Sequence, residues 1–550
     1  MSTSLRIVPL GGLGEIGKNS MVFEMDKDII LVDAGLMFPE EEMLGVDLVI
    51  PDISYLLEHR QRVRGIIITH GHEDHTGALP YLLRQLQTPI YCPRLAHGLI
   101  TVKLKEHNLL GETTLRVVQA GEKVNLGAFR VEFFQVAHSI PDSMGLIIHT
   151  PLGPVVHTGD FKLDHTPVMG QKTDLARLSR LGDEGALLLL SDSTYAETPG
   201  YTLSEQVVEQ ALEQIMATAS GRVIIATFAS LIARVQQIID AAHRQGRRVF
   251  ITGRNMQDNA QMARELGYIR PPDNVFIGVE ELRRLPPNKI VVVTTGSQGE
   301  PTSALVRMAN RDHRHVQIVP GDTVVLSASP IPGNEQLINR TVDNLVKLGA
   351  EVFYRGVGNV HVHGHAAQEE LKLILSLVRP RYFIPVHGEY RHLVQHARLA
   401  QAVGIPRENT FVLEDGDILE LDGKGASVVG KAPCDYVYVD GLGVGDVDHV
   451  VLRDRKRLAH GGIVVVIVAV DKKTGRVVGE PEVVARGLAD IEESAELLEG
   501  TRGAVISALN GAEHIAEWGA INTQVKEAVA RYLYERTRRR PLILPVAVEV

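Results

Sequence analysis

His70-Gly71-His72-Glu73-Asp74-His75 is the stretch of sequence that decides the fold. It follows Gly65–Thr69 (GIIIT), whose apolar, β-branched residues predict a buried strand. A helix is expected directly after it, over Thr76–Gln87. Five ionisable side chains in six residues make a poor core, and their simplest physical use is to share cations. Because imidazole and carboxylate together suit Zn²⁺ or Mn²⁺, the segment favours a metal site over a solvated charged turn.

Further polar side chains stand just beyond apolar strands elsewhere in the chain. They are Asp33 after the strand 29–32, His138 after 131–136, and Asp160 after 154–156. The ends of such strands converge on one rim of a sheet sandwich, so these side chains are expected near residues 70–75. Taken singly, each histidine would more often be structural. Together and in this order, they favour one shared metal centre.

A glycine-rich segment, Gly12-Leu13-Gly14-Glu15-Ile16-Gly17, matches the fingerprint of dinucleotide-binding proteins. That function needs a helix to begin in the segment, so that its N-terminus can face the pyrophosphate. The residues that follow, Met21–Met25 and Ile29–Val32, instead predict the two strands of a β-hairpin. We therefore set the dinucleotide site aside.

The rhythm of the chain changes at about residue 203. Before about residue 165, short β-branched runs alternate with glycine-rich turns, and few helices are expected. Helix and strand then alternate through a helix at 203–220, a strand at 222–227, a helix at 231–245 and a strand at 248–252. This alternation predicts a parallel sheet covered by helices.

Composition sets broad limits. A chain of 550 residues is expected to form three or four domains, at about 150 residues each. Its net charge of −10 makes a nonspecific basic coat for nucleic acid improbable, so a polyanion needs a local positive patch or a metal centre. The two cysteines, Cys92 and Cys434, suggest neither a disulfide scaffold nor a thiolate zinc site. Without a signal-peptide pattern or a long apolar run, the chain is expected to be soluble and cytoplasmic.

The ordered set of polar residues resembles the successive motifs of the metallo-β-lactamase superfamily. The resemblance implies an α/β fold with an αββα sandwich and two divalent metal ions, Zn²⁺ or Mn²⁺. It implies that His70, His72 and His138 hold one ion. Asp74, His75 and a later histidine would hold the second ion, with Asp160 bridging the two and Asp33 orienting a histidine ligand.

A long insertion narrows the resemblance to the β-CASP nucleases. The sandwich pattern stops near residue 202 and resumes with Ile384–Glu389 (IPVHGE), which supplies His387 as the expected last ligand of the second ion. Two further signatures match: Asp192 after a strand and His365 at the close of the insertion. The implied domains are 1–202 and 365–440 for the two parts of the metallo-β-lactamase domain, 203–364 for the β-CASP domain, 441–460 for a linker and 461–550 for a small C-terminal α+β domain.

Within this group the chain is most similar to the ribonuclease J family. The matching segments are Gly11–Asn19, Phe228–Ser230, Thr295–Glu300 and the C-terminal region. The resemblance implies 5′→3′ exonuclease and endonuclease action on single-stranded RNA with 5′-monophosphate ends. It also implies mRNA decay and rRNA maturation as the setting, a homodimer, other RNA-decay proteins as partners and no membrane.

The resemblance also implies catalytic roles. Asp74, Asp192 and His365 are the expected catalytic residues, with His365 as the general acid and Asp192 as the group that orients it. Water attacks phosphorus in this scheme, leaving a 5′-phosphate and a 3′-hydroxyl. The expected pocket for the RNA 5′-phosphate contains Ser230, His361, His363 and Gly364.

Two positions in that pocket need a closer look. Where the family pattern leads us to expect a serine ahead of Gly364-His365, this chain has His363, which would alter phosphate binding. Ser230 serves equally well as a plain N-cap of the helix that follows it. Runs of arginine at 453–457 and 536–540 could touch RNA, although such runs are more often solvated faces.

Three other functions compete. A DNA-specific β-CASP nuclease is the nearest alternative, and only the family resemblance argues against it. A small-ester metallohydrolase of the glyoxalase II kind needs neither the insertion nor His365. A noncatalytic RNA-binding scaffold would be expected to have lost some of the ligand set.

Overall fold

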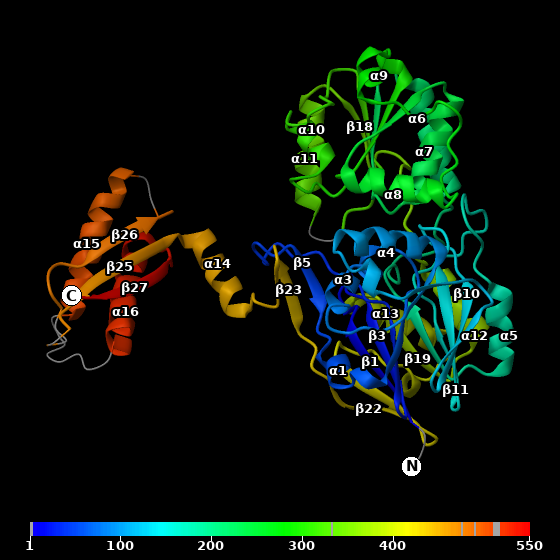
Figure 1. Ribbon diagram of the computed structural model, residues 1–550, viewed down its shortest axis with the longest axis horizontal. Coiled ribbons are helices and arrows are strands. Elements are labelled where there is room, and N and C mark those ends of the chain that lie inside the picture. Colours follow the sequence, from blue (N-terminus) through cyan, green and yellow to red (C-terminus); the bar gives the residue numbers. More distant parts are fainter. Residues whose placement is uncertain (1–3, 332–333, 473, 475–476, 489–490, 510–517) are drawn as a thin grey trace. The chain divides into compact units, whose positions relative to one another are not determined.

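The computed structural model describes residues 4–331, 334–472, 474, 477–488, 491–509 and 518–550 (Figure 1). The chain forms two units. The first comprises Met1–Phe38 and Leu48–Val437, and the second comprises Pro39–Asp47 and Tyr438–Val550.

Two β-sheets form the sandwich of the first unit. The eight-stranded sheet has the order β22-β21-β1-β3-β4-β6-β7-β8, and the six-stranded sheet has the order β19-β13-β12-β11-β10-β9. The strands of the first sheet are β1 (Leu5–Gly11), β3 (Ser20–Met25), β4 (Asp28–Val32), β6 (Val63–Ile67), β7 (Ile90–Pro93), β8 (Leu115–Val118), β21 (Asp417–Leu421) and β22 (Ala426–Lys431). Those of the second are β9 (Lys123–Leu126), β10 (Phe129–Gln135), β11 (Met144–Thr150), β12 (Gly153–His157), β13 (Leu188–Asp192) and β19 (Tyr382–Val386).

The main core lies between these two sheets. Phe23 and Ile30 of the first sheet share one apolar cluster with Leu146, Leu190 and Ile384 of the second. Helices cover both outer faces: α1 (Ser54–Glu58), α3 (Leu79–Leu82) and α4 (Arg94–Glu106) lie on the first sheet, and α5 (Leu175–Glu184), α12 (Gln368–Val378) and α13 (Tyr390–Ala402) lie on the second. The predicted αββα sandwich is confirmed.

The insertion forms a separate parallel sheet. Its order is β15-β16-β14-β17-β18, with β14 (Val223–Ala226), β15 (Arg248–Ile251), β16 (Ile290–Thr294), β17 (Thr323–Leu326) and β18 (Glu351–Phe353). The helices α6 (Gln206–Thr218), α7 (Ile232–Arg244) and α8 (Arg254–Glu265) cover one face, and α9 (Val279–Arg284), α10 (Ala304–Ala309) and α11 (Glu335–Lys347) cover the other. Burial on both faces explains why the strand sequences are continuous apolar runs.

Several expected elements differ from the structure. The single helix predicted over 76–87 was wrong: α2 (Glu73–Thr76) and α3 are two short helices. Pro80 accounts for the break, because it has no N–H to donate to the carbonyl of Thr76. The glycine-rich segment 12–17 contains β2 (Leu13–Gly14) and leads into β3, and the antiparallel pairing of β3 with β4 confirms the β-hairpin predicted after it.

The second unit contains a three-stranded sheet. Strand β25 (Ile463–Val470) pairs antiparallel with β26 (Glu482–Arg486) and parallel with β27 (Leu542–Glu549). The helices α15 (Ile491–Leu509) and α16 (Trp518–Thr537) contribute to one shared apolar core. Most of the linker expected at 441–460 is instead the helix α14 (His449–Gly461), which the side chain of Asp448 caps by accepting from two backbone N–H groups. None of the helices in the described segments has the length and apolar character needed to cross a membrane.

An ion pair between Glu132 of β10 and Arg177 of α5 ties this helix to the second sheet. Arg177 donates from Nε and Nη2 to the two carboxylate oxygens at 2.6 and 3.2 Å. The hydrogen bond from Arg177, opposed by burial, lowers the pKa of Glu132 to about 2. Because this value lies below the ordinary 4.5, the pair stabilises the fold above pH 4.5, and its contribution is lost as the pH falls toward 2.

Glu132→Gln is therefore expected to lower the free energy of unfolding by about 1–2 kcal/mol at pH 7 and by less than half as much at pH 3. Urea unfolding at the two pH values measures the difference. Glu184→Gln is the matched control, because this exposed carboxylate lies 3.4 Å from the same arginine. An equal loss for Glu132→Gln at both pH values would contradict the assignment.

Candidate metal centre

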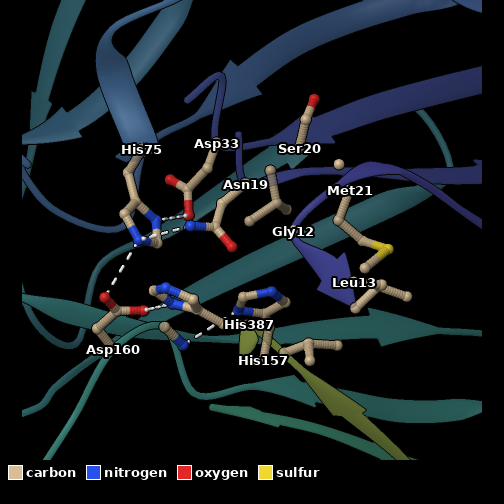
Figure 2. A pocket seen from close by; sticks show the side chains of 14 residues that line it. Gly12, Leu13, Asn19, Ser20, Met21, Asp33, His75, His157, Asp160 and His387 are labelled. Carbon is tan, nitrogen blue, oxygen red and sulfur yellow. Dashed lines mark hydrogen bonds and ion pairs between the residues drawn. The ribbon is translucent and has the colours of Figure 1, made fainter. Parts of the chain in front are cut away.

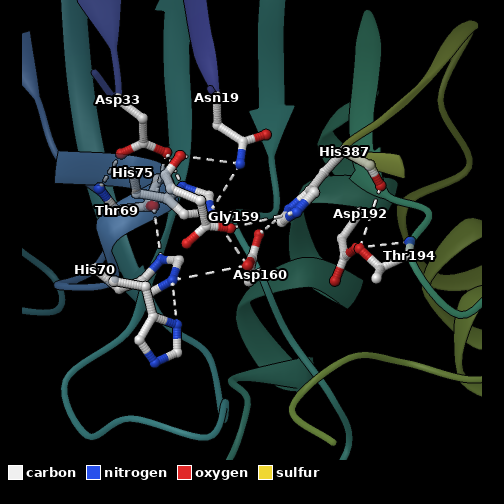
Figure 3. A network of polar contacts seen from close by, with 12 residues as sticks. Asn19, Asp33, Thr69, His70, His75, Gly159, Asp160, Asp192, Thr194 and His387 are labelled. Carbon is white, nitrogen blue, oxygen red and sulfur yellow. Dashed lines mark hydrogen bonds and ion pairs between the residues drawn. The ribbon is translucent and has the colours of Figure 1, made fainter. Parts of the chain in front are cut away.

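The candidate ligands lie beyond the ends of strands, at one rim of the sandwich (Figure 3). His70 and His72 follow β6, and Asp74 and His75 lie in α2, directly after them. The remaining residues each follow a strand of one of the two sheets: Asp33 after β4, His138 after β10, Asp160 after β12 and His387 after β19. The expected convergence of strand ends is therefore present.

A first group of ligand atoms consists of three imidazoles. His70 Nε2 and His138 Nε2 lie 3.1 and 3.2 Å from His72 Nδ1. Burial lowers the pKa of His72 to about 4 and holds those of His70 and His138 well below the ordinary 6.5. Three neutral rings that direct nitrogen atoms at one point repel each other unless a cation lies between them, so this donor set fits a metal ion.

A second group combines two carboxylates and two imidazoles. The ligand atoms of Asp74, His75, Asp160 and His387 all lie within 4.8 Å of one another. Asp160 Oδ2 is 3.2 Å from His75 Nε2, and Asp160 Oδ1 is 2.7 Å from His387 Nδ1. This mixture of oxygen and nitrogen donors fits Zn²⁺ or Mn²⁺.

Asp160 lies between the two groups. Its Oδ2 is 3.7 Å from His70 Nε2 and 3.8 Å from His138 Nε2, as well as being close to His75. Burial would raise the pKa of this carboxyl, but His387 and His75 outweigh it and hold the pKa well below its ordinary value. Asp160 is therefore an anion at neutral pH, and its carboxylate lies between the two groups of candidate ligands.

Side chains and carbonyls behind the ligands fix their orientation. Asp33 Oδ2 accepts from His75 Nδ1 at 2.8 Å and from Thr69 Oγ1 at 2.8 Å, and Asp33 Oδ1 accepts from the Thr69 backbone N–H. His138 Nδ1 donates to the carbonyl of Gly364 at 2.7 Å. Because Nδ1 is the donor in each ring, Nε2 is left with a lone pair that points into the cluster.

Asp33→Ala is expected to weaken metal binding by about 10- to 100-fold while leaving all the candidate ligands in place. Competition with a fluorescent zinc chelator measures the change in affinity. Thr69→Val is a milder variant, because it removes one of the hydrogen bonds to Asp33 and keeps the carboxylate–imidazole contact. An Asp33→Ala protein with unchanged metal affinity would show that Asp33 only supports the strand end.

His365 and Asp192 form a pair beside the two groups. His365 Nδ1 donates to Asp192 Oδ2 at 2.8 Å, and Asp192 Oδ1 accepts from the Thr194 backbone and hydroxyl. Although burial lowers it, Asp192 raises the pKa of His365 to about 9. His365 is thus a cation at neutral pH with its Nε2–H group left to donate elsewhere.

The residues expected for the 5′-phosphate pocket are only partly brought together. His363 Nδ1 donates to the carbonyl of His365 at 3.0 Å, which joins it to the His365–Asp192 pair. Gly364 touches the ring of His138, and a Cβ there would lie 2.5 Å from that ring. Among the described residues, Ser230 forms no hydrogen bond with the histidines of 361–365. Ser230 is also not the N-cap of α7, which is Leu231 and makes no side-chain cap.

Sequence reasoning missed three residues of the site. Thr69 holds Asp33, and Asn19 Nδ2 donates to the carbonyl of Asp74 at 3.1 Å. Tyr195 stacks on His363, with ring centroids 3.5 Å apart and planes 9° apart. Asn19 is the last residue of the segment 11–19, which matches the family. Its place in that segment was the one sequence feature that could have indicated a role in the site.

The segment 11–19 also reaches the far side of the metal centre. Strand β2 pairs with β20 (Gly388–Glu389), directly after His387. A cavity of about 20 Å³, the space of roughly one water molecule, lies between this segment and the second group (Figure 2). Asn19, Asp33, His75, Asp160 and His387 line it. The glycine-rich segment thus closes one wall of the site.

Comparisons with known families divide the chain into four matches. They are the metallo-beta-lactamase superfamily over residues 13–194, the beta-CASP domain of ribonuclease J over 220–345, the RNA specificity domain of zinc-dependent metallo-hydrolases over 350–412, and the ribonuclease J C-terminal domain over 450–550. The matches therefore extend over most of both units.

Curated relatives align with the chain from end to end. Ribonuclease J2 of Bacillus subtilis is 44% identical over 100% of this chain and 99% of its own length. Ribonuclease J 1 of Streptococcus pyogenes is 44% identical over 98% and 97%, and Ribonuclease J of Thermus thermophilus is 44% identical over 99% and 95%. A solved structure of a protein of unknown function from Enterococcus faecalis aligns at a TM-score of 0.55 and 15% identity, covering 76% of this chain and 100% of that one, and shows the fold alone.

Proposed function

Since this chain belongs to the ribonuclease J family, we propose that it is a metal-dependent nuclease that hydrolyses phosphodiester bonds in single-stranded RNA. One structural observation supports the proposal independently of the family membership. Two groups of ligand atoms share Asp160, and the His365–Asp192 pair stands next to them. That arrangement supplies the donor set of a two-metal hydrolase and a proton donor in one site.

Two divalent metal ions, Zn²⁺ or Mn²⁺, are the proposed cofactors. His70, His72 and His138 would hold one, and Asp74, His75 and His387 the other, with Asp160 reaching both. When bound, such ions polarise the scissile phosphate and activate a water molecule. The residues behind the ligands, Asp33 and the Gly364 carbonyl, keep the ring nitrogens directed inward.

The protein's own residues handle the leaving group. His365 is protonated at neutral pH and donates from Nε2 to the 3′-oxygen as the P–O3′ bond breaks. Asp192 holds Nδ1 and stabilises the positive charge before the transfer. The products are a 5′-phosphate and a 3′-hydroxyl. In this scheme the RNA 2′-hydroxyl plays no part as a nucleophile.

Attack is proposed to begin at the RNA 5′ end and to proceed 5′→3′, with internal cleavage as a second mode. A 5′-monophosphate would occupy a pocket formed by Ser230, His361, His363 and Gly364. His361 supports this assignment, because its buried Nδ1 has no hydrogen-bond partner in the described chain and is available to a ligand.

Biological setting and assembly are proposed from the family alone. They are mRNA decay and rRNA maturation in the cytoplasm, a homodimeric assembly and contacts with other RNA-decay proteins. Sedimentation velocity of the purified protein at physiological salt tests the dimer, because it measures whether the main species has the mass of one chain or of two.

One assay separates the proposed function from its competitors. Purified protein is incubated with 5′-labelled monophosphorylated RNA, with 5′-triphosphorylated RNA, with DNA of the same sequence and with a small thioester, each with Zn²⁺, with Mn²⁺ and with EDTA. We expect labelled mononucleotide from monophosphorylated RNA first, slower release from the triphosphate and none with EDTA. Faster cleavage of DNA would establish the DNA-specific alternative, and cleavage of a thioester but of neither nucleic acid would establish the small-ester one.

A further inference from the structure

The C-terminal end of α16 carries a concentrated basic surface. Residues 528–548 contain five arginines and a single acidic residue, Glu535, in a chain whose net charge is −10. We use the name arginine–tyrosine surface for Arg536, Arg538, Arg540, Tyr532 and Tyr534. All three arginines are exposed. The second unit thus presents a local positive patch, of the kind that a mildly acidic protein needs in order to bind a polyanion.

Aromatic rings hold these arginines in place. The guanidinium groups of Arg538 and Arg540 lie 5.4 and 4.8 Å from the ring centroid of Tyr534, and Arg536 lies 5.9 Å from that of Tyr532. Tyr534 nevertheless keeps 36% of its surface exposed. Stacked guanidinium groups lose less freedom when they bind a phosphate, and the exposed part of the Tyr534 ring is available for contact with a nucleobase.

The three arginines have no carboxylate partner among the residues that the structure describes, and Glu535 forms no ion pair with them. Other cations of the same unit are paired: Lys456 with Glu42, Lys472 with Glu549 and Arg502 with Glu499. Within the described residues, the charge of the arginine–tyrosine surface is thus not compensated by a carboxylate, whereas that of the other three cations is.

Arg538 also occupies a strained backbone position. Its φ of 57° is the left-handed conformation, and its N–H donates to the carbonyl of Tyr534 at 2.9 Å to close the last turn of α16. Glycine is the residue that this position favours, because a side chain there is strained. The arginine at this position therefore carries a backbone strain that glycine would relieve.

From these observations we propose that the arginine–tyrosine surface is a second RNA-binding site, separate from the metal centre, which holds single-stranded RNA during cleavage. The arginines neutralise backbone phosphates, and Tyr534 stacks on an unpaired base. The proposal rests on the proposed ribonuclease function for the identity of the polyanion. Stacking favours a single strand, because bases in a duplex do not expose their faces.

Binding without cleavage is the direct test. The full-length protein is titrated in EDTA with a fluorescein-labelled 20-nucleotide RNA at several salt concentrations, with fluorescence anisotropy as the readout. The variant Arg536→Ala/Arg538→Gly/Arg540→Ala is expected to bind about 10- to 100-fold more weakly at 0.1 M salt. The slope of log K against log salt should fall by about 2, because each phosphate contact to a single strand contributes roughly 0.7.

Single variants separate stacking from charge. Tyr534→Leu is expected to weaken binding about tenfold with little change in the salt slope, and Tyr534→Phe should retain wild-type affinity. Arg538→Gly alone should weaken binding while leaving the urea midpoint unchanged or higher, since glycine relieves the backbone strain. A lower midpoint with unchanged affinity would make Arg538 a structural residue and overturn its part in the site.

The matched control removes three paired cations from the same unit: Lys456→Ala/Lys472→Ala/Arg502→Ala. It carries the same change in net charge, and its salt slope should stay near the wild-type value. Equal losses in the two triple variants would overturn the proposal, because general charge would then explain the binding. A patch variant that changes the sedimentation coefficient but keeps its salt slope would also overturn it and would make the surface a protein contact.

Failure of this site and failure of the nuclease proposal have different signatures. Hydrolysis of bis(p-nitrophenyl) phosphate needs a catalytic centre but no polynucleotide, so the patch variant should hydrolyse it at the wild-type rate. If the wild-type protein does not hydrolyse this compound, the nuclease proposal fails, but the measured difference in RNA affinity between the wild type and the patch variant remains valid. Normal hydrolysis together with unchanged RNA affinity in the patch variant would count against the second site alone.

Discussion

Asp160→Ala is expected to lower the rate of RNA cleavage by about 10³-fold or more and to release bound metal. The reason is its position: one carboxylate oxygen faces His70, His75 and His138, and the other faces His387. Asp160 is thus the candidate ligand that lies between both groups. Removing it leaves the buried imidazoles without the anion that would balance the two proposed divalent cations, so both proposed ions should bind more weakly.

Elemental analysis after gel filtration measures the metal content, and cleavage of labelled RNA measures the rate. Asp174→Asn is the matched control, because Asp174 caps α5 through the Arg177 backbone N–H and lies outside the centre. That variant should keep its stability close to that of the wild type, because asparagine caps a helix about as well as aspartate, and it should keep both metal and rate. An Asp160→Ala protein that retains two metal ions per chain would remove Asp160 from the bridging position.

The placement of the ligands follows from a simple regularity in the sequence. The candidate ligands follow apolar strands, either in the loop after the strand or, for Asp74 and His75, in the short helix α2 after β6, and these strand ends meet at one rim of the sandwich. The backbone at two of these ends could not be foreseen. Asp33 and His387 have φ angles of 62° and 54°, which is the left-handed conformation. Neither residue is a glycine, so nothing in the sequence indicated this conformation. Such strain is maintained where the surrounding structure fixes the residue for a purpose.

Contacts between distant segments were beyond sequence reasoning. Gly364 was predicted to line a phosphate pocket, and no sequence pattern indicated that its carbonyl also orients His138, more than 200 positions earlier in the chain. The stack of Tyr195 on His363 likewise depends on how the insertion returns to the sandwich. Helix α14 was missed for a local reason, since the glycine-rich residues before it suggested a linker and obscured the cap at Asp448.

His365→Ala is expected to slow cleavage by about 10²- to 10⁴-fold while leaving the metal content unchanged. His365 lies within reach of a third possible ligand group with Asp160, Asp192 and His387, so the metal measurement distinguishes a proton donor from a ligand. Asp192→Asn should cause a smaller loss in the same direction, because it removes the anion that keeps His365 protonated but keeps a hydrogen-bond acceptor. His243→Ala, in the last turn of α7, is the control and should have no effect.

A change of leaving group tests the proton transfer itself. In RNA with a bridging 3′-sulfur at the scissile position, the sulfur departs as a thiolate and needs no proton, because the pKa of a thiol lies far below that of an alcohol. If His365 donates the proton, His365→Ala should lose most of its effect on this substrate, and the deficit should shrink to about tenfold or less. If His365 instead holds the RNA or a metal ion, the deficit will be the same for sulfur and oxygen, because neither of those roles depends on the basicity of the leaving atom.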